Sequence, residues 1–152
     1  MTESQRVDEI NVVAAATIAY RGFLHSKEFT YKLKDLRNKH SFINTSLLRL
    51  DITFSDLDEH VTVLLKRSKT DHDHIGVDII IAATGTLTCP IRALRHLFEE
   101  DPQPIDSPLF RFSTGALLYR KFVSMVRQRL QESGIPNLEE YSRHSFRRGA
   151  AT

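Results

Sequence analysis

Hydrophobic residues change their spacing along the chain, and the first spacing is that of a helix. Residues 8–24 are dense in aliphatic side chains after a polar beginning, which predicts a largely buried first helix whose last turn is weakened by Gly22. Residues 27–39 are basic, and their few apolar side chains fit either a short helix or a strand. Both alternatives stay open for that segment.

Strict alternation of apolar and polar residues follows. It runs from 48 to 54 and again from 61 to 65, which is the period of a strand with one buried face. A third β-rich stretch covers residues 77–83, and the polar segments 55–59 and 68–74 separate the three. The pattern predicts a three-stranded antiparallel sheet.

Helical spacing returns in the second half of the chain. Pro90 begins a helix with one apolar face, which ends at Asp101, and a proline-rich linker follows. A longer apolar stripe predicts a helix that is capped by Ser113 or Thr114 and ends at Gly134. A last helix begins near residues 142–145. Helices beside one antiparallel sheet predict a mainly helical α+β fold.

Length and composition narrow the class of protein. The chain has 152 residues, which suits one domain with a single core, and its 41% hydrophobic and 26% charged residues are typical of globular chains. No apolar stretch approaches the roughly 20 residues that a membrane span needs, and no signal peptide opens the chain. We therefore expect neither a membrane partner nor secretion.

Cysteine content and net charge add two further constraints. The single cysteine, Cys89, can form no internal disulfide and no cysteine-based zinc site, which indicates a reducing compartment, the nucleus or the cytoplasm. The 21 Lys and Arg residues nearly balance the 19 Asp and Glu residues, and the net charge of +2 is too small to indicate a nucleic-acid partner. Evidence for DNA binding must come from local residues.

One candidate for chemistry lies near the end of the chain. His144 and Arg147 are three positions apart, so they share one face of a helix and suit a phosphate. Two residues are a weak pattern, and the spacing alone favours a solvated, basic helix end.

Two other charged clusters are weaker candidates. Residues 71–74 (DHDH) have side chains of the metal-ligand type, but consecutive loop residues point in different directions and no further cluster completes a coordination shell. We predict a solvated loop and no metal. Residues 99–101 (EED) are carboxylates of the kind used in acid–base chemistry, yet we expect a solvated helix terminus there.

Three short stretches, in this order and spacing, give the chain a resemblance that covers nearly its whole length. They are residues 19–30 (AYRGFLHSKEFT), residues 68–71 (SKTD) and residues 144–152 (HSFRRGAAT). With them, the chain resembles the catalytic domain of tyrosine recombinases of the phage-integrase family, closest to the eukaryotic mobile-element branch that includes Crypton-like recombinases. Residues 89–94 (CPIRAL) and 107–110 (SPLF) also look like connecting segments of that branch.

The resemblance implies a reaction and roles for four residues. In the family a tyrosine attacks a DNA phosphodiester and forms a 3′-phosphotyrosine, while arginines, a lysine and histidines stabilise the transition state without metal or other cofactor. Arg147 matches the second arginine of the family, and His144 matches a histidine that binds the same phosphate. Lys69 matches the lysine that protonates the leaving oxygen, with Lys66 as the alternative.

The chain departs from the family pattern in two respects. The family's first arginine, in a Leu-Arg-x-x-Glu pattern, is replaced by His25, whose imidazole has a reference pKa of about 6.5 and cannot make the two-pronged contact of an arginine. Arg21, one helical turn earlier, is a possible substitute. The family's nucleophilic tyrosine follows the HxxR box, whereas all four tyrosines here precede it. We therefore expect residues 1–152 to be a partial catalytic domain that is inactive alone.

The resemblance also implies a partner and a geometry. We expect binding to duplex DNA, with a recombinase oligomer forming on the DNA and no small-molecule substrate. Two alternatives stay open, a domesticated DNA-binding module without catalysis and a protein-interaction module. The catalytic candidates His25, Lys69, His144 and Arg147 should converge on one basic pocket beside the sheet. The additional DNA-binding candidates are Arg21, Lys66, Arg143 and Arg148.

Overall fold

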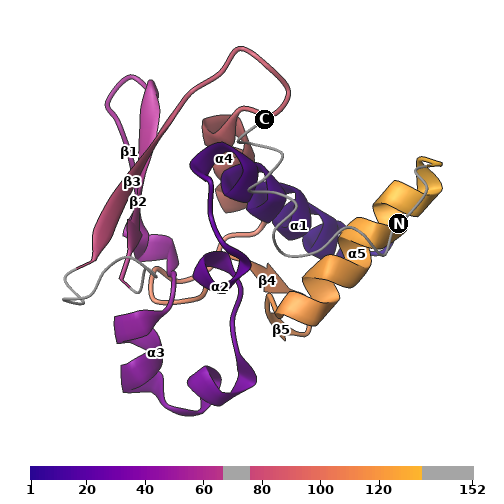
Figure 1. The fold of residues 1–152 in the computed structure, drawn as a ribbon, viewed down its shortest axis with the longest axis horizontal. Helices are drawn as coiled ribbons and strands as arrows, with labels where there is room; N and C mark the ends of the chain where they lie inside the picture. Colours follow the sequence, from indigo (N-terminus) through magenta and orange to yellow (C-terminus); the bar gives the residue numbers. More distant parts are fainter. Residues whose placement is uncertain (67–75, 135–152) are drawn as a thin grey trace.

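The computed structural model describes residues 1–66 and 76–134 of the chain. They form a mixed fold in which a three-stranded sheet, two packed helices and a further helix follow one another across the molecule (Figure 1). The sheet lies at one side, α1 and α4 pack against it, and α5 lies beyond α1. The predicted α+β class is therefore confirmed. The expected last helix, near residues 142–145, lies outside the described ranges.

The first helix, α1 (Glu3–Gly22), begins five positions earlier than the apolar pattern predicts. The reason is a capping box, in which the Thr2 hydroxyl accepts the Gln5 backbone N–H at 3.2 Å and the Gln5 side chain accepts the Thr2 N–H at 2.8 Å. At its other end, a Cβ atom on Gly22 would lie 2.9 Å from Ile81 Cδ1. The absence of a side chain at Gly22 thus lets the end of α1 pack closely on the sheet.

The ambiguous basic segment is helical in short pieces. It contains the last three residues of α2 (Ser26–Phe29), the 3-10 helix η1 (Leu33–Arg37) and the first residue of α3 (Lys39–Thr45). Neither one continuous helix nor a strand forms, because Tyr31 leaves the helical path to make a bridge with Leu118.

The predicted three-stranded antiparallel sheet is confirmed, with strand order β1-β2-β3. Its members are β1 (Ile52–Phe54), β2 (His60–Leu65) and β3 (Val77–Ala82). Every second residue of β2 is buried, starting at Val61, which is the alternation that predicts this strand. Val61 faces Ile81 across the β2–β3 pair.

The first strand is shorter than predicted. Alternation from 48 to 54 predicts a strand of seven residues, but β1 is preceded by the 3-10 turn η2 (Arg49–Asp51). Within η2 both charged residues are buried and Leu50 is 46% exposed, the reverse of the expected pattern. Charged partners from distant parts of the chain hold the two buried side chains in place.

The helix expected after Pro90 is confirmed as α4 (Pro90–Glu100). Its buried face carries Ile91, Leu94 and Leu97, spaced as a single helical stripe. Asp101 is its C-cap. None of the helices within the two described ranges is long and apolar enough to cross a membrane.

The second long helix begins later than predicted. Ser113 and Thr114 do not cap it; they form the turn of a hairpin between β4 (Arg111–Phe112) and β5 (Gly115–Ala116). The helix itself, α5 (Tyr119–Glu132), is preceded by Leu118 as N-cap. The predicted stop at Gly134 is consistent with its φ of +79°, a conformation that glycine adopts readily.

Candidate nucleic-acid interface

His25, which the sequence predicts to take the place of a first catalytic arginine, is the N-cap of α2. Its backbone N–H donates a hydrogen bond to Glu28 Oε1 at 2.7 Å, so the glutamate three positions later fixes the start of the helix. The preceding Leu24 is buried in the core and His25 itself is half-buried. The Leu-His-x-x-Glu pattern thus has a local structural role, which positions the histidine at the junction of α1 and α2.

An aromatic pair packs α2 against α5. Phe29, the last residue of α2, meets Phe122 of α5 edge to face, with ring centroids 5.2 Å apart. Both side chains are fully buried. The position of α2 is therefore tied to that of α5.

Arg21 lies at the end of α1, where the helix touches β3. Its Nε donates to the Thr88 carbonyl oxygen at 3.3 Å, and its Nη2 donates to the hydroxyls of Thr86 and Thr88. The contact between Gly22 and Ile81 places this group at the end of the sheet where β3 leaves it. The guanidinium is partly exposed and partly engaged by threonines.

Lys66 is directed into the protein. Its Nζ lies 3.0 Å from the Oδ2 of Asp51, whose side chain is 0% exposed, and donates to the carbonyl oxygens of Ile43 at 2.7 Å and Ser46 at 3.3 Å. It follows Leu65 at the end of β2, away from the Val61–Ile81 pair. Among the DNA-binding candidates in the described ranges, Arg21 and Lys66 therefore lie at opposite ends of the strand pair.

Most of the predicted site falls outside the described residues. Lys69 belongs to the connection between β2 and β3, and the other candidates in this group follow α5 in the sequence. The convergence of His25 with these residues therefore stays a prediction. The group outside the described ranges is Lys69, Arg143, His144, Arg147 and Arg148.

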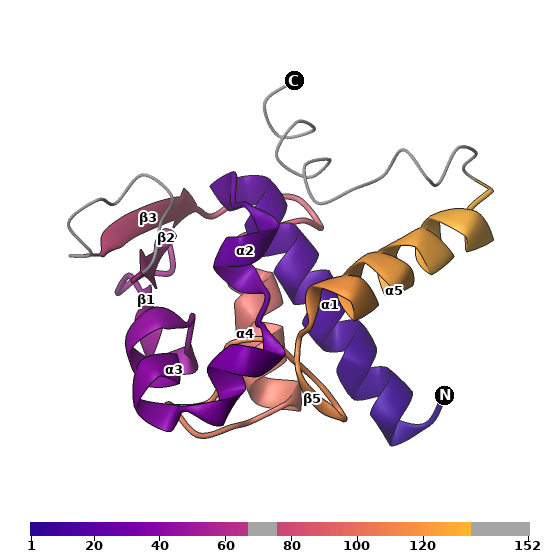
Figure 2. The same cartoon turned by 60° about the horizontal axis from the view of Figure 1, so that its bottom comes forward.

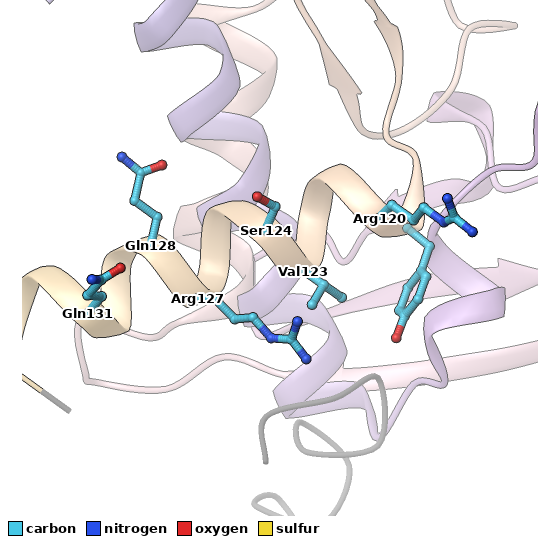
Figure 3. A pocket seen from close by; sticks show the side chains of 7 residues that line it. Arg120, Val123, Ser124, Arg127, Gln128 and Gln131 are labelled. Carbon is cyan, nitrogen blue, oxygen red and sulfur yellow. The ribbon is translucent and has the colours of Figure 1, made fainter. Parts of the chain in front are cut away.

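One face of α5 lines a hollow that the sequence reasoning missed. The hollow has a volume of about 550 Å³, and its described lining comes wholly from α5 (Figure 3). We call this lining the α5 face. It consists of Tyr119, Arg120, Val123, Ser124, Arg127, Gln128 and Gln131. No carboxylate is among these residues, and the signal for them was the regular spacing of polar positions opposite the apolar stripe of the helix.

The remaining cations of α5 point elsewhere. Arg129 forms an ion pair with Glu9 of α1, and Lys121 lies with its Nζ 4.4 Å from the ring centroid of Phe112. These contacts fix the rotation of α5 about its axis. Arg120, which is exposed, and Arg127, which is half-buried, are consequently left on the α5 face.

A cluster of charged side chains surrounds the buried Asp101. The Asp101 carboxylate, 3% exposed, accepts hydrogen bonds from Arg111 Nε at 2.9 Å and Asn11 Nδ2 at 3.0 Å, and lies 3.4 Å from Arg49 Nη2. Arg49 Nη1 also donates to the Asp101 carbonyl oxygen at 2.6 Å. The expectation of a solvated helix terminus at residues 99–101 is therefore wrong for Asp101, whose partners come from three distant segments.

The environment shifts the pKa values of both charged partners. Burial alone raises the pKa of the Asp101 carboxyl, but hydrogen bonds from Arg111 and Asn11 and the positive charges of Arg111 and Arg49 outweigh it, so the pKa is lowered. Burial lowers the pKa of Arg49, and Asp101 opposes that effect. These ion pairs join η2, the end of α4 and β4.

Metal binding has no support within the described ranges. There, no three His, Cys, Asp or Glu side chains are grouped as ligands for a metal ion. The DHDH segment at 71–74 lies outside these ranges.

Comparison with known proteins gives no family. No protein-family model, no curated protein and no solved structure matches this chain. The recombinase assignment is therefore a proposal.

Proposed function

We propose that this chain is a duplex-DNA-binding part of a tyrosine-recombinase catalytic domain. The observation that carries the proposal is the α5 face, which lines a hollow with two arginines and no carboxylate among its residues. A surface of this kind attracts the phosphate backbone, which supplies most of the affinity in sequence-independent DNA binding.

The chemistry of the α5 face suits DNA better than a generic anion. A helix fits the major groove, where its arginines can reach phosphates and its glutamines can pair with adenine through two hydrogen bonds. Arg120, Ser124, Arg127 and Gln131 recur at helical spacing on this face. The amide of Gln128 donates to Glu132 at 3.3 Å, an exposed contact that a base edge can replace.

The order of elements supports the recombinase part of the proposal. His25 starts α2 at the end of α1, Lys69 belongs to the connection between β2 and β3, and the HxxR box of His144 and Arg147 follows α5. In this proposal Arg147 and His144 bind the phosphoryl oxygens and Lys69 protonates the leaving oxygen. His25 supplies a hydrogen bond, but not the fixed charge of an arginine.

A module that binds DNA without cutting it is the second candidate function. The observation in its favour is His25 itself, since an imidazole stabilises the phosphoryl transition state less than a guanidinium does. Residues 1–152 alone should form no covalent adduct under either candidate, because all four tyrosines precede the HxxR box. A nicked suicide duplex therefore distinguishes the two candidates in a longer chain that carries a tyrosine after the box. A covalent protein–DNA adduct would favour the recombinase, and binding without an adduct would favour the module.

The binding proposal is tested by changing the α5 face alone. We expect Arg120→Gln/Arg127→Gln to weaken binding to a fluorescent 30-base-pair duplex. The slope of log affinity against log salt should also become less steep by about 2, because two phosphates are no longer neutralised. The matched control is Arg92→Gln/Arg95→Gln, which removes two exposed charges from α4. Equal behaviour of the two variants, or no duplex binding by the unmodified chain, would overturn the proposal.

A further inference from the structure

A ten-residue excursion carries a second group of cations outside the candidate site. Residues 32–41, here called the basic loop, contain no buried residue. The excursion is closed at its base by Tyr31 and Phe42, which are both buried and whose ring centroids lie 6.0 Å apart. The Tyr31 hydroxyl also donates to the Leu47 carbonyl oxygen at 2.5 Å. A well-anchored base thus presents a segment in which no residue is buried.

The cations of the basic loop have no internal role. Lys32, Lys34, Arg37 and Lys39 are all exposed, and within the described residues none of their side chains forms an ion pair or a hydrogen bond. The loop has a single carboxylate, Asp35. Packing and intramolecular pairing therefore do not explain four positive charges in eight residues.

The basic loop begins where α5 begins. The Tyr31 backbone N–H donates to the Leu117 carbonyl oxygen at 3.0 Å, and Tyr31 forms a parallel bridge with Leu118, the N-cap of α5. Lys32 therefore follows directly on one side of this bridge, and Arg120 lies two residues beyond it on the other. Figure 2 shows the two chain segments running side by side between α2 and the start of α5.

We infer that the basic loop is a second DNA-binding surface, which extends the α5 face along the same duplex and binds phosphates without reading bases. The inference rests on the proposed DNA-binding function. Duplex DNA carries one negative charge per roughly 1.7 Å of its axis, so a cationic extension next to the α5 face meets further phosphates. Lysine ammonium groups act as point charges, and contacts to phosphate position a protein on DNA without specifying sequence.

The test compares loop variants with a control of equal charge in the full chain. Lys32→Gln/Lys34→Gln removes two charges, as does the control Arg92→Gln/Arg95→Gln, and Lys32→Gln/Lys34→Gln/Arg37→Gln/Lys39→Gln removes all four. Binding is measured by fluorescence anisotropy on two 30-base-pair duplexes of unrelated sequence. Because none of the loop residues is buried, a thermal melt should show that the fold is retained.

We expect the slope of log affinity against log salt to become less steep by about 0.9 for each phosphate that is no longer neutralised. The fourfold variant should bind both duplexes at least about tenfold more weakly than the unmodified chain does. If the unmodified chain binds duplex DNA and the loop variants behave like the control, the inference fails and the proposed function stands. If the unmodified chain does not bind duplex DNA, both fail.

A membrane surface is the rival partner, because Leu33 and Leu36 are 63% and 38% exposed among the cations. Vesicles containing phosphatidylserine test it directly. Vesicle binding that depends on the four cations, with unchanged DNA binding, would overturn the inference. DNA binding that depends on them, without vesicle binding, would support it.

Discussion

Two groups of cations in this molecule face opposite ways. Arg49, Arg111 and Lys66 point inward and meet the buried carboxylates of Asp101 and Asp51. The cations of the basic loop and Arg120 of the α5 face are exposed, and within the described ranges no carboxylate lines the hollow or pairs with the loop. The net charge of +2 does not show this division, because it counts buried and exposed charges alike.

The contrast shows how the same residue types acquire different roles. A buried cation needs a carboxylate, since the cost of removing both charges from water is recovered only when they pair and are hydrogen-bonded. An exposed cation contributes little to stability and stays available for a ligand. Stability measurements should therefore respond to the inward group and DNA binding to the outward group.

The largest expected effect is on the inward side. Asp101→Asn leaves Arg49 and Arg111 without their shared carboxylate, and we expect the free energy of unfolding in urea to fall by about 3–5 kcal/mol. The control is Asp58→Asn, which removes an exposed carboxylate paired with Arg95 at 2.7 Å and should cost less than about 1 kcal/mol. Similar losses in the two variants would remove the distinction between buried and exposed pairs.

Acid should weaken the same cluster. The pKa of Asp101 is lowered in the folded protein from an ordinary value of 3.8, so its stabilising contribution is fully present above that value and is lost as the pH falls toward the lowered pKa. The free energy of unfolding, measured from pH 7 downward, should therefore decline below about pH 4. In Asp101→Asn that part of the decline should disappear. An unchanged pH profile in the variant would contradict the assignment.

A variant of Lys66 tests whether this predicted DNA-binding residue belongs to the inward or to the outward group of cations. Lys66→Gln leaves the buried Asp51 carboxylate without its cation, and we expect the free energy of unfolding to fall by about 1–3 kcal/mol. The salt slope of DNA binding should stay unchanged, because the ammonium is held inside. A salt slope that is less steep by about 0.9 would instead show that Lys66 contacts a DNA phosphate.

The smallest effect is expected from the outward group. Lys32→Gln/Lys34→Gln touches no buried atom, so the free energy of unfolding should change by less than about 0.5 kcal/mol. Urea unfolding of this variant beside Lys66→Gln makes the comparison direct. A loss as large as that of Lys66→Gln would show that the loop cations stabilise the fold.

The parts of the fold that were predicted correctly depend on local patterns. The alternation around Val61 and the stripe of Ile91, Leu94 and Leu97 are complete within one element, so β2 and α4 could be found from the sequence. The strand expected from residue 48 was wrong because Arg49 turns inward to pair with Asp101, 52 positions away. Nothing in the local sequence reveals such a partner.

The candidate site, like the fold, could be predicted from local sequence patterns only in part. The spacing of polar residues on α5 was visible in the sequence, but which of its cations stay outward depends on Glu9 and Phe112, which lie outside this helix. The basic segment was ambiguous because its course is set by the bridge from Tyr31 to Leu118. Only the structure shows that residues 32–41 leave the core altogether.

The most direct test of DNA binding is the salt dependence of the unmodified chain on duplex DNA. Two arginines on the α5 face and four cations in the basic loop predict that log affinity falls against log salt with a slope at least as steep as about −5. Titrations of a labelled duplex at about 50 to 200 mM salt, near neutral pH, measure this slope. A slope close to zero, or no binding at the lowest salt, would contradict the proposed function.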